Sequence, residues 1–274
     1  MSITAELEPH ARGSFTQRVA VVVGGGSGLG RAVAKALARQ GANIVVADFD
    51  TPRMERTVEE VLRLGTTEAA IALSTDVRSD ASVRSLARDA IKSMGRVDVV
   101  VNAAGVLLHG KLEKIKGDDW RWMLETNLVG AVRTSTAFLP HLIARGSGNI
   151  VNIVSYGGLM PQDPEFLPYD TCGAAIAIYT EGLASQLAGT GVTASMFCPG
   201  SKGPRIGQNT RSRGVGRIFR GADSGSDPSS QLDQLAGALI DGIHQKRFLI
   251  LGDPSEAEAF RGRWDHLDVN SSTP

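Results

Sequence analysis

The sequence predicts an α/β domain built on a doubly wound parallel sheet with helices on both faces. Three observations favour this fold class. Short runs of β-branched and apolar residues alternate with segments of helical periodicity along most of the chain. The first run ends in a glycine-rich turn, and an aspartate closes the second. The 274 residues suffice for one domain with a substantial core, and no short internal repeat divides them.

The first four strands and three helices of this prediction precede residue 102. Residues 18–23 are β-branched and end in glycines, and residues 28–40 have apolar positions at helical spacing until Gly41 stops them. Pro52 suits the first turn of a second helix, which Gly65 terminates. The strands are expected at 18–23, 43–47, 69–73 and 97–101, and the third helix at 79–94.

The rest of the chain continues the alternation. A long helical segment spans 118–144, and Pro140 should bend or interrupt it near its end. We therefore expect one Rossmann-like domain over 15–264, between an N-terminal tail at 1–14 and a C-terminal tail at 265–274. The later strands are expected at 150–154, 192–197 and 248–251, and the later helices at 168–188 and 231–244.

Composition narrows the classes of function. The 29 basic and 29 acidic residues cancel, so no net charge favours nucleic acid or an anionic membrane as a partner. Residues 1–17 are polar, without an apolar stretch of signal-peptide length, and no run approaches the ~20 apolar residues of a membrane span. Cys172 and Cys198 lack metal-ligand spacing, so neither a metal site nor a disulfide is expected. These features predict a cytoplasmic protein.

A glycine-rich turn, Gly24-Gly25-Gly26-Ser27-Gly28-Leu29-Gly30, lies between the first strand and the first helix. Such a turn lets the backbone approach a pyrophosphate and presents the free amides of the helix N-terminus to the anion. Asp48 follows about 20 residues later, at the end of the second strand. A glycine cluster alone can be a structural turn, but in this context it predicts a dinucleotide site.

Asp48 also bears on the choice of cofactor. A carboxylate at this position can accept hydrogen bonds from the adenosine ribose, and it repels a 2′-phosphate. Asp50 adds negative charge, and the glycine turn contains no Lys or Arg. Arg31 and Arg53 lie close enough in sequence to leave NADP as the alternative. NAD is the predicted cofactor.

Further motifs follow the strand ends and the long helix in a fixed order. They are Asp76-Val77, Asn102-Ala103-Ala104-Gly105, Asn127, Ser155, Tyr169 and Pro199-Gly200. With the glycine turn, this order resembles the short-chain dehydrogenase/reductase family from about Thr16 to Leu251. The resemblance implies a set of cofactor-binding residues: Gly24, Ser27, Gly28, Leu29, Gly30, Asp48, Phe49, Asp76, Val77, Asn102, Ala103, Gly105, Pro199 and Gly200.

The same resemblance implies hydride transfer between nicotinamide and a carbonyl or alcohol carbon. Tyr169 would exchange the proton of the substrate oxygen, Ser155 would hold that oxygen, and Asn127 would position a water in the proton relay. The family places a lysine four residues after the tyrosine, where this chain has Gly173. In the family, that lysine lowers the pKa of the tyrosine and binds the nicotinamide ribose.

Loss of the lysine affects the two directions of the reaction differently. A tyrosine with an unperturbed pKa of about 10, acting as a base, is handicapped by about 4 kcal/mol relative to one tuned to about 7. As an acid, Tyr169 starts in the correct protonation state, so reduction should suffer less than alcohol oxidation. Loss of the ribose contact should also loosen the hydride geometry.

Other departures from the family pattern lie in the same neighbourhood. Val23 replaces a threonine before the first glycine, and Pro204, which has no backbone donor, replaces a threonine near the carboxamide. The connection from Ser155 to Tyr169 is slightly longer than usual. Three groups are candidates to replace the lysine: Lys202, His109, and a water in the space that Gly173 is expected to leave empty.

The segment after Pro199-Gly200 is rich in arginine and glycine: Arg205, Arg211, Arg213, Arg217 and Arg220. The arginines belong either to a mobile, solvated cover of the substrate site or to a site for an anionic handle on the substrate. No aromatic platform accompanies them to suggest nucleic acid. By resemblance, the helix of Tyr169 forms a subunit interface of a homodimer or homotetramer.

Three hypotheses about function remain. The first is an NAD-dependent oxidoreductase acting on a small-molecule ketone or alcohol, weakened or specialised by loss of the lysine. The second is a non-redox enzyme (an isomerase, cyclase or lyase) that uses Tyr169 and Ser155 for proton transfer. The third is a pseudoenzyme that binds a dinucleotide or a partner without turnover. The retained Ser155, Tyr169 and Asn127 favour the first two, and the first is our leading prediction.

Overall fold

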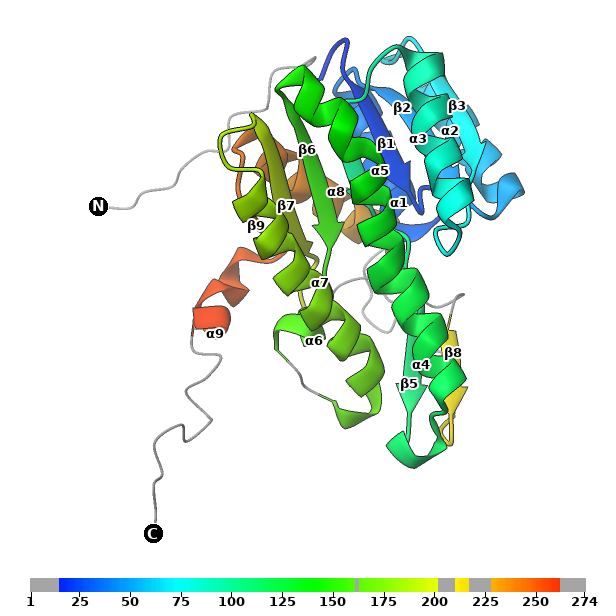
Figure 1. The fold of residues 1–274 in the computed structure, drawn as a ribbon, viewed down its shortest axis with the longest axis vertical. Helices are drawn as coiled ribbons and strands as arrows, with labels where there is room; N and C mark the ends of the chain where they lie inside the picture. Colours follow the sequence, from blue (N-terminus) through cyan, green and yellow to red (C-terminus); the bar gives the residue numbers. More distant parts are fainter. Residues whose placement is uncertain (1–14, 161–162, 202–209, 217–227, 262–274) are drawn as a thin grey trace.

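The computed structural model describes residues 15–160, 163–201, 210–216 and 228–261. At its centre is a seven-stranded parallel sheet in the order β3-β2-β1-β4-β6-β7-β9 (Figure 1). This arrangement confirms the predicted fold class. The strands are β1 (Val19–Val23), β2 (Asn43–Asp48), β3 (Ala70–Ser74), β4 (Val99–Asn102), β6 (Gly148–Ile153), β7 (Val192–Cys198) and β9 (Leu249–Leu251).

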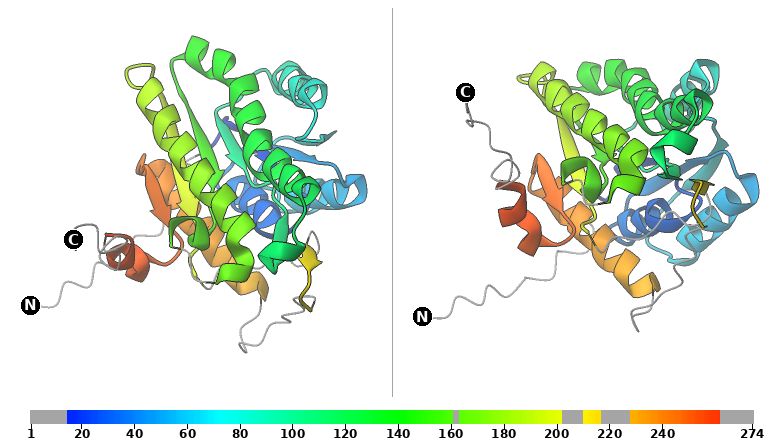
Figure 2. Two further views of the ribbon diagram at one scale, coloured as in Figure 1. Left: turned by 60° about the horizontal axis from the view of Figure 1, so that its bottom comes forward. Right: turned by 90° about the horizontal axis from the view of Figure 1, so that it is seen from below.

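Helices cover both faces of the sheet (Figure 2). One face packs against α1 (Gly28–Arg39), α2 (Thr51–Arg63) and α8 (Pro228–His244), and the other against α3 (Asp80–Met94), α5 (Gly130–Arg145) and α7 (Leu167–Gln186). Successive side chains of β1 enter the two cores in turn: Val22 shares a buried cluster with Leu37 of α1, and Val21 shares one with Phe138 of α5. Every residue of β1 is buried, as expected for a central parallel strand.

The long helical segment is irregular at a different place from the one predicted. It begins as α4 (Gly117–Leu124), passes through a π-helical turn at Glu125–Val129, and continues as α5 through Pro140. Within the π turn, the Asn127 side chain accepts a hydrogen bond from the Val106 amide and donates one to the Val106 carbonyl, both at 2.8 Å. Pro140 therefore does not interrupt the helix, and the π turn ties the helix to the chain after β4.

Several short elements are absent from the sequence prediction. Two four-residue strands, β5 (Leu107–Gly110) and β8 (Thr210–Arg213), form a separate parallel pair beside α4. A single-turn helix, α6 (Tyr156–Leu159), follows β6 directly. After β9, a 3-10 turn at Pro254–Glu256 leads into α9 (Ala257–Arg261). These elements surround the carboxyl ends of the main sheet (Figure 1).

Helices α6 and α7 pack backbone against backbone. A Cβ atom added to Gly158 would lie 2.5 Å from Cα of Gly173. One added to Gly173 would lie 2.9 Å from Cα of Gly158 and 2.5 Å from Oγ of Ser155. That same Ser155 oxygen accepts a hydrogen bond from the Gly158 amide at 3.2 Å and so begins α6. Glycine at both positions allows this approach.

The packing of α6 predicts opposite effects of alanine at two glycines of α7. Gly173→Ala should lower the free energy of unfolding by about 1–3 kcal/mol, because the new methyl group overlaps Ser155 and Gly158. Gly182 is the matched control, since nothing lies within 4 Å of its Cβ position. Gly182→Ala should stabilise the protein by up to about 1 kcal/mol through helix propensity. Thermal denaturation measures both changes, and equal melting temperatures for the two variants would contradict the packing argument.

Candidate active site

A cavity of about 760 Å³ follows the carboxyl ends of the central strands, from Asp48 of β2 past Val23 of β1 to Ser155 after β6 and Pro199 after β7. Strand order reverses between β1 and β4, and open parallel sheets bind ligands at such a switch point. Most of the predicted site residues line this cavity: Gly24, Ser27, Gly28, Leu29, Gly30, Asp48, Phe49, Asp76, Val77, Ala103, Gly105, Ser155, Tyr169 and Pro199.

The glycine turn has the geometry of an anion cradle. Gly24 adopts a φ of +81°, and a Cβ there would lie 2.5 Å from the Ala104 amide nitrogen, so the turn requires glycine. Within the described residues, no side chain caps the N-terminus of α1, where Ser27 is the N-cap residue. The first amides of α1 are therefore available to an anion in the cavity.

Asp48 lies beside the glycine turn, close to ion pairs of neighbouring residues. Its two oxygens accept hydrogen bonds from the amides of Gly26 (3.0 Å) and Asp50 (3.1 Å), which fix the carboxylate against the turn. The nearby cations are engaged by other carboxylates: Arg53 contacts Asp50 at 3.0 Å, and Arg31 donates to Glu60 at 3.0 Å. Asp48 therefore shares this end of the cavity with Arg31, Arg53 and Arg56, of which Arg31 and Arg53 are paired with other carboxylates.

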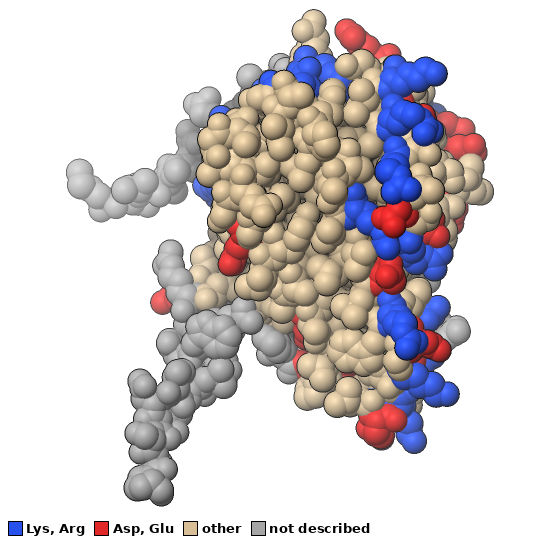
Figure 3. Space-filling view, in the orientation of Figure 1, with Lys and Arg blue, Asp and Glu red and all other residues tan. Residues whose placement is uncertain are grey.

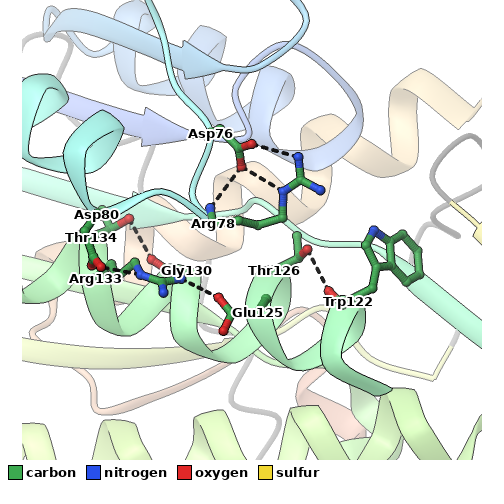
Figure 4. Close-up of polar contacts among 9 residues, drawn as sticks. All are labelled: Asp76, Arg78, Asp80, Trp122, Glu125, Thr126, Gly130, Arg133 and Thr134. Carbon is green, nitrogen blue, oxygen red and sulfur yellow. Dashed lines mark hydrogen bonds and ion pairs between the residues drawn. The ribbon is translucent and has the colours of Figure 1, made fainter. Parts of the chain in front are cut away.

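Two apolar side chains flank the adjoining part of the cavity. Phe49 is 65% exposed, which is unusual for so large an apolar side chain, and Val77 lies beyond it along the cavity wall. The carboxylate of Asp76 accepts hydrogen bonds from the Arg78 guanidinium at 2.9 and 2.7 Å (Figure 4). These hydrogen bonds hold the pKa of Asp76 below its usual value. Phe49 and Val77 are thus apolar residues of the cavity lining, while Asp76 is held by Arg78.

The start of α3, which carries this wall, is braced against the π turn. Arg133 of α5 donates to Asp80 at 2.9 Å and to Glu125 at 2.7 Å (Figure 4). The same π turn contains Asn127, which clamps Val106 as described above. Arg133 therefore fixes the start of α3 relative to the π turn.

Tyr169 and Ser155 meet at the other end of the cavity, where both are among its lining residues. Burial is the main cause that raises the pKa of Tyr169, and the neighbouring Asp170, Cys172 and Cys198 act in the same direction. Both cysteines are buried free thiols, and burial raises the pKa of each to about 12. The tyrosine hydroxyl therefore stays protonated at neutral pH.

The space beside Gly173 is partly filled. A Cβ at Gly173 would lie 2.5 Å from Oγ of Ser155 and 2.9 Å from Cα of Gly158. A small cavity of about 70 Å³ remains farther along, lined by Asn102, Asn127, Ser155, Tyr169 and Gly173 among others. The buried Oδ1 of Asn102 has no hydrogen-bond partner among the described residues. This cavity includes polar side chains and is large enough for water, so the replacement of the lysine ammonium by a water stays a prediction.

His109 does not replace the lysine. It lies in β5, is only 1% exposed, and has its Nε2 2.6 Å from Oγ of Ser212 in β8. Its ring stacks on Phe166 at 5.7 Å, and burial lowers its pKa. His109 borders neither of the two cavities, so this candidate is wrong. Lys202 and Pro204 lie outside the described residues.

The described arginines of the covering segment contact α4 and remain partly exposed. Arg213 makes a bidentate pair with the buried Asp119 of α4, at 2.8 and 2.6 Å. Arg211 stacks on the ring of Trp122, with its guanidinium carbon 3.8 Å from the ring centroid. Trp122, which was not among the predicted site residues, lines the large cavity. Arg205, Arg217 and Arg220 lie outside the described residues.

Three predicted residues do not line the large cavity. Asn102 and Asn127 border only the small one, and Gly200 borders neither, although it directly follows Pro199. Within the described ranges, no group of three His, Cys, Asp or Glu side chains could hold a metal ion. A search of the same residues found no helix with both the length and the apolar character needed to cross a membrane.

Known proteins share this fold and much of this sequence. The family model for short chain dehydrogenases matches residues 18–213. An uncharacterized oxidoreductase of Staphylococcus aureus (strain USA300) is 32% identical over 186 residues, covering 68% of this chain and 78% of the relative. A short chain dehydrogenase/reductase from Burkholderia phymatum, solved in complex with NAD, gives a TM-score of 0.80 at 29% identity and covers 95% and 98% of the two chains.

A second solved structure agrees with this grouping. The apo form of LigD from Sphingobium sp. strain SYK-6 gives a TM-score of 0.77 at 27% identity, covering 95% of this chain and 99% of that protein. The family match spans the glycine turn, Asp48, Ser155 and Tyr169, which the structure brings to one cavity. The chain therefore belongs to the short-chain dehydrogenase/reductase family, a family of oxidoreductases.

Proposed function

We propose that this protein is an NAD-dependent oxidoreductase that reduces the carbonyl group of a small-molecule substrate. The observation that carries the proposal is the single cavity that joins an uncapped helix N-terminus and Asp48 to Ser155 and Tyr169. The NAD complex of the Burkholderia relative supports the same placement of a dinucleotide.

The cavity offers a separate feature to each part of the cofactor. The glycine turn and the first amides of α1 would bind the pyrophosphate, and Asp48 would accept hydrogen bonds from the adenosine ribose. Phe49 and Val77 would enclose the adenine, which accounts for the exposure of Phe49. The nicotinamide would then lie between Pro199 and Tyr169, where it supplies a hydride to a carbonyl carbon.

Ser155 is oriented to donate to the substrate oxygen. Its hydroxyl oxygen accepts the Gly158 amide hydrogen, so its own hydrogen is free to point elsewhere. Because Ser155 borders the cavity, that hydrogen can reach a carbonyl oxygen placed there. A donor at this point stabilises the negative charge that develops as the carbonyl is reduced.

Tyr169 would then deliver the proton that completes the alcohol. Its raised pKa keeps the hydroxyl protonated at neutral pH and leaves almost no phenolate to act as a base. The proton moves from Tyr169 to the substrate oxygen. The small cavity beside Asn127 offers a place for a water that would then supply a new proton to Tyr169. We therefore propose reduction, rather than alcohol oxidation, as the favoured direction.

The cofactor proposal predicts a preference for NADH. Isothermal calorimetry should give a Kd for NADH at least about tenfold below that for NADPH, since Asp48 repels the 2′-phosphate. Asp48→Asn keeps an acceptor for the Gly26 amide but removes the negative charge. This variant should therefore have a smaller difference between its Kd values for NADH and NADPH. Equal affinity of the parent protein for the two cofactors would refute the assignment of Asp48, and Arg56, which also lines the cavity, would then be the candidate for the phosphate.

The reaction proposal predicts how the rate depends on pH. Carbonyl reduction should vary little between about pH 6 and about pH 9, because Tyr169 stays protonated over that range. Tyr169→Phe should lower kcat by about 10²- to 10⁴-fold and leave the Kd for NADH unchanged. Steady-state rates on a panel of ketones measure both effects. NADH binding without reduction of any ketone would shift the assignment to the non-redox enzyme.

The outer face of α7 supports the proposal that the protein is a homodimer or homotetramer. The surface over α5 and α7 is almost free of charged side chains, in contrast to the basic and acidic stripe beside it (Figure 3). Ile178 of α7 is 68% exposed on its helix. An uncharged face of this extent is typical of a protein contact.

The subunit proposal predicts that one charge at this face changes the assembly. Ile178→Glu should shift the mass measured by light scattering from a dimer or tetramer towards the monomer, because the carboxylate would be buried at the contact. Leu62→Glu is the control, since Leu62 is also exposed (47%) but lies on α2. A monomeric parent protein, or an unchanged mass for the Ile178 variant, would contradict this interface.

A further inference from the structure

The C-terminal segment after β9 lies directly against the turn that follows β7. The amide of Gly252 donates to the carbonyl of Cys198 at 2.8 Å. A Cβ atom at Gly252 would lie 2.6 Å from the carbonyl oxygen of Pro199, so the two backbones are in close contact. Pro199 is the residue of this turn that lines the large cavity.

Glu256 makes the strongest contact between these segments. One carboxylate oxygen, Oε1, accepts hydrogen bonds from both the amide and the hydroxyl of Ser201, at 2.9 and 2.6 Å. The other oxygen, Oε2, lies beside Gly200, where an added Cβ would be 2.9 Å away. Gly200 has a φ of +97°, so the turn that Glu256 holds requires glycine at this point.

The same C-terminal segment also reaches the loop after β6. The ring of Phe260 in α9 lies 5.4 Å from the ring of Tyr156, which directly follows Ser155. The segment from Gly252 to Phe260 thus joins the two strand exits that carry Ser155 and Pro199. Both of these residues border the reaction end of the cavity.

The carboxylate of Glu256 is not optimised for stability alone. Its Oε2 is buried and has no hydrogen-bond partner among the described residues. An unpaired buried acceptor costs free energy, whereas an apolar side chain of similar size would avoid that cost. An apolar replacement would lose both hydrogen bonds to Ser201. We therefore infer that Glu256 maintains the shape of the turn from Pro199 to Ser201.

We propose that Glu256 is a positioning residue for the nicotinamide half of the cofactor site. It borders neither cavity, so it would act through the turn from Pro199 to Ser201 and not by touching the ligand. The adenosine half, built on β1, β2 and α1, has no contact with this segment through Glu256 and should not depend on it. This inference rests on the proposed function, because it assumes that a nicotinamide lies beside Pro199.

The two halves of the site can be tested separately by comparing the binding of NADH with that of ADP-ribose, which lacks the nicotinamide. Glu256→Ala should raise the Kd for NADH about tenfold, through loss of two hydrogen bonds to a charged acceptor. The Kd for ADP-ribose should stay within about twofold of the parent value. Glu256→Gln keeps an oxygen that can accept both bonds from Ser201 and should restore most of the NADH affinity. Calorimetry measures each Kd.

Two further variants control for damage to the segment. Glu258→Ala removes an exposed carboxylate from the same segment and should change neither Kd. Ser201→Ala removes only the hydroxyl donor and should weaken NADH binding by a smaller factor than Glu256→Ala does. This second variant keeps the inference testable if the Glu256 variant does not fold.

The outcomes distinguish this inference from the proposed function. If the Glu256→Ala variant bound NADH and ADP-ribose more weakly by the same factor, Glu256 would stabilise the fold as a whole. If its affinity for NADH were unchanged, Glu256 would not position the nicotinamide half of the site. Either result overturns the inference while leaving the proposed function intact. A parent protein that binds neither ligand would instead overturn the proposed function.

Discussion

The close contact between α6 and α7 determines the geometry of the reaction end. With glycine at 158 and 173, the two backbones approach until Ser155 Oγ lies 2.5 Å from the position of a Cβ on Gly173. The contact fixes Ser155 as the cap of α6 and leaves its hydroxyl hydrogen for the cavity. A lysine at 173 would place its Cβ against Ser155 and Gly158, so these groups would have to shift.

That packing has a chemical consequence for Tyr169. An ammonium beside the phenol would lower its pKa, whereas the groups around it here are buried thiols, the Asp170 carboxyl and apolar side chains, and burial raises the pKa. The other end of the cavity, at the N-terminus of α1, differs in having helix amides without a side-chain cap and the fixed carboxylate of Asp48. In the proposed function, this polar end binds the cofactor, and the tyrosine acts as an acid at the opposite end.

The sequence predicted the sheet and its cofactor edge because both depend on local signals, namely β-branched runs and a glycine turn before a helix. The sequence-based prediction was wrong where segments that are distant in sequence contact one another. The four-residue strand β5 pairs with a partner about a hundred positions later, so the sequence predicted neither strand, and His109 was a candidate to replace the lysine although it belongs to this pair. The irregularity of the long helix lies at Asn127 and not at Pro140, because the hydrogen bonds between the Asn127 side chain and Val106 stabilise the π turn. The Gly173 spacing could not reveal that Gly158 approaches it.

The segment after β7 is fixed at two points by residues that are remote in sequence. Glu256 holds Ser201 at its start, and Asp119 with β5 holds Arg213 farther along. Between Arg211 and the cavity stands Trp122, so the anchored arginine also sets the position of one cavity wall. Neither Glu256 nor Asp119 belongs to the motifs that carry the family resemblance. The positions of Trp122 and of the turn after β7 therefore depend on contacts that lie outside those motifs, and the motifs alone do not predict them.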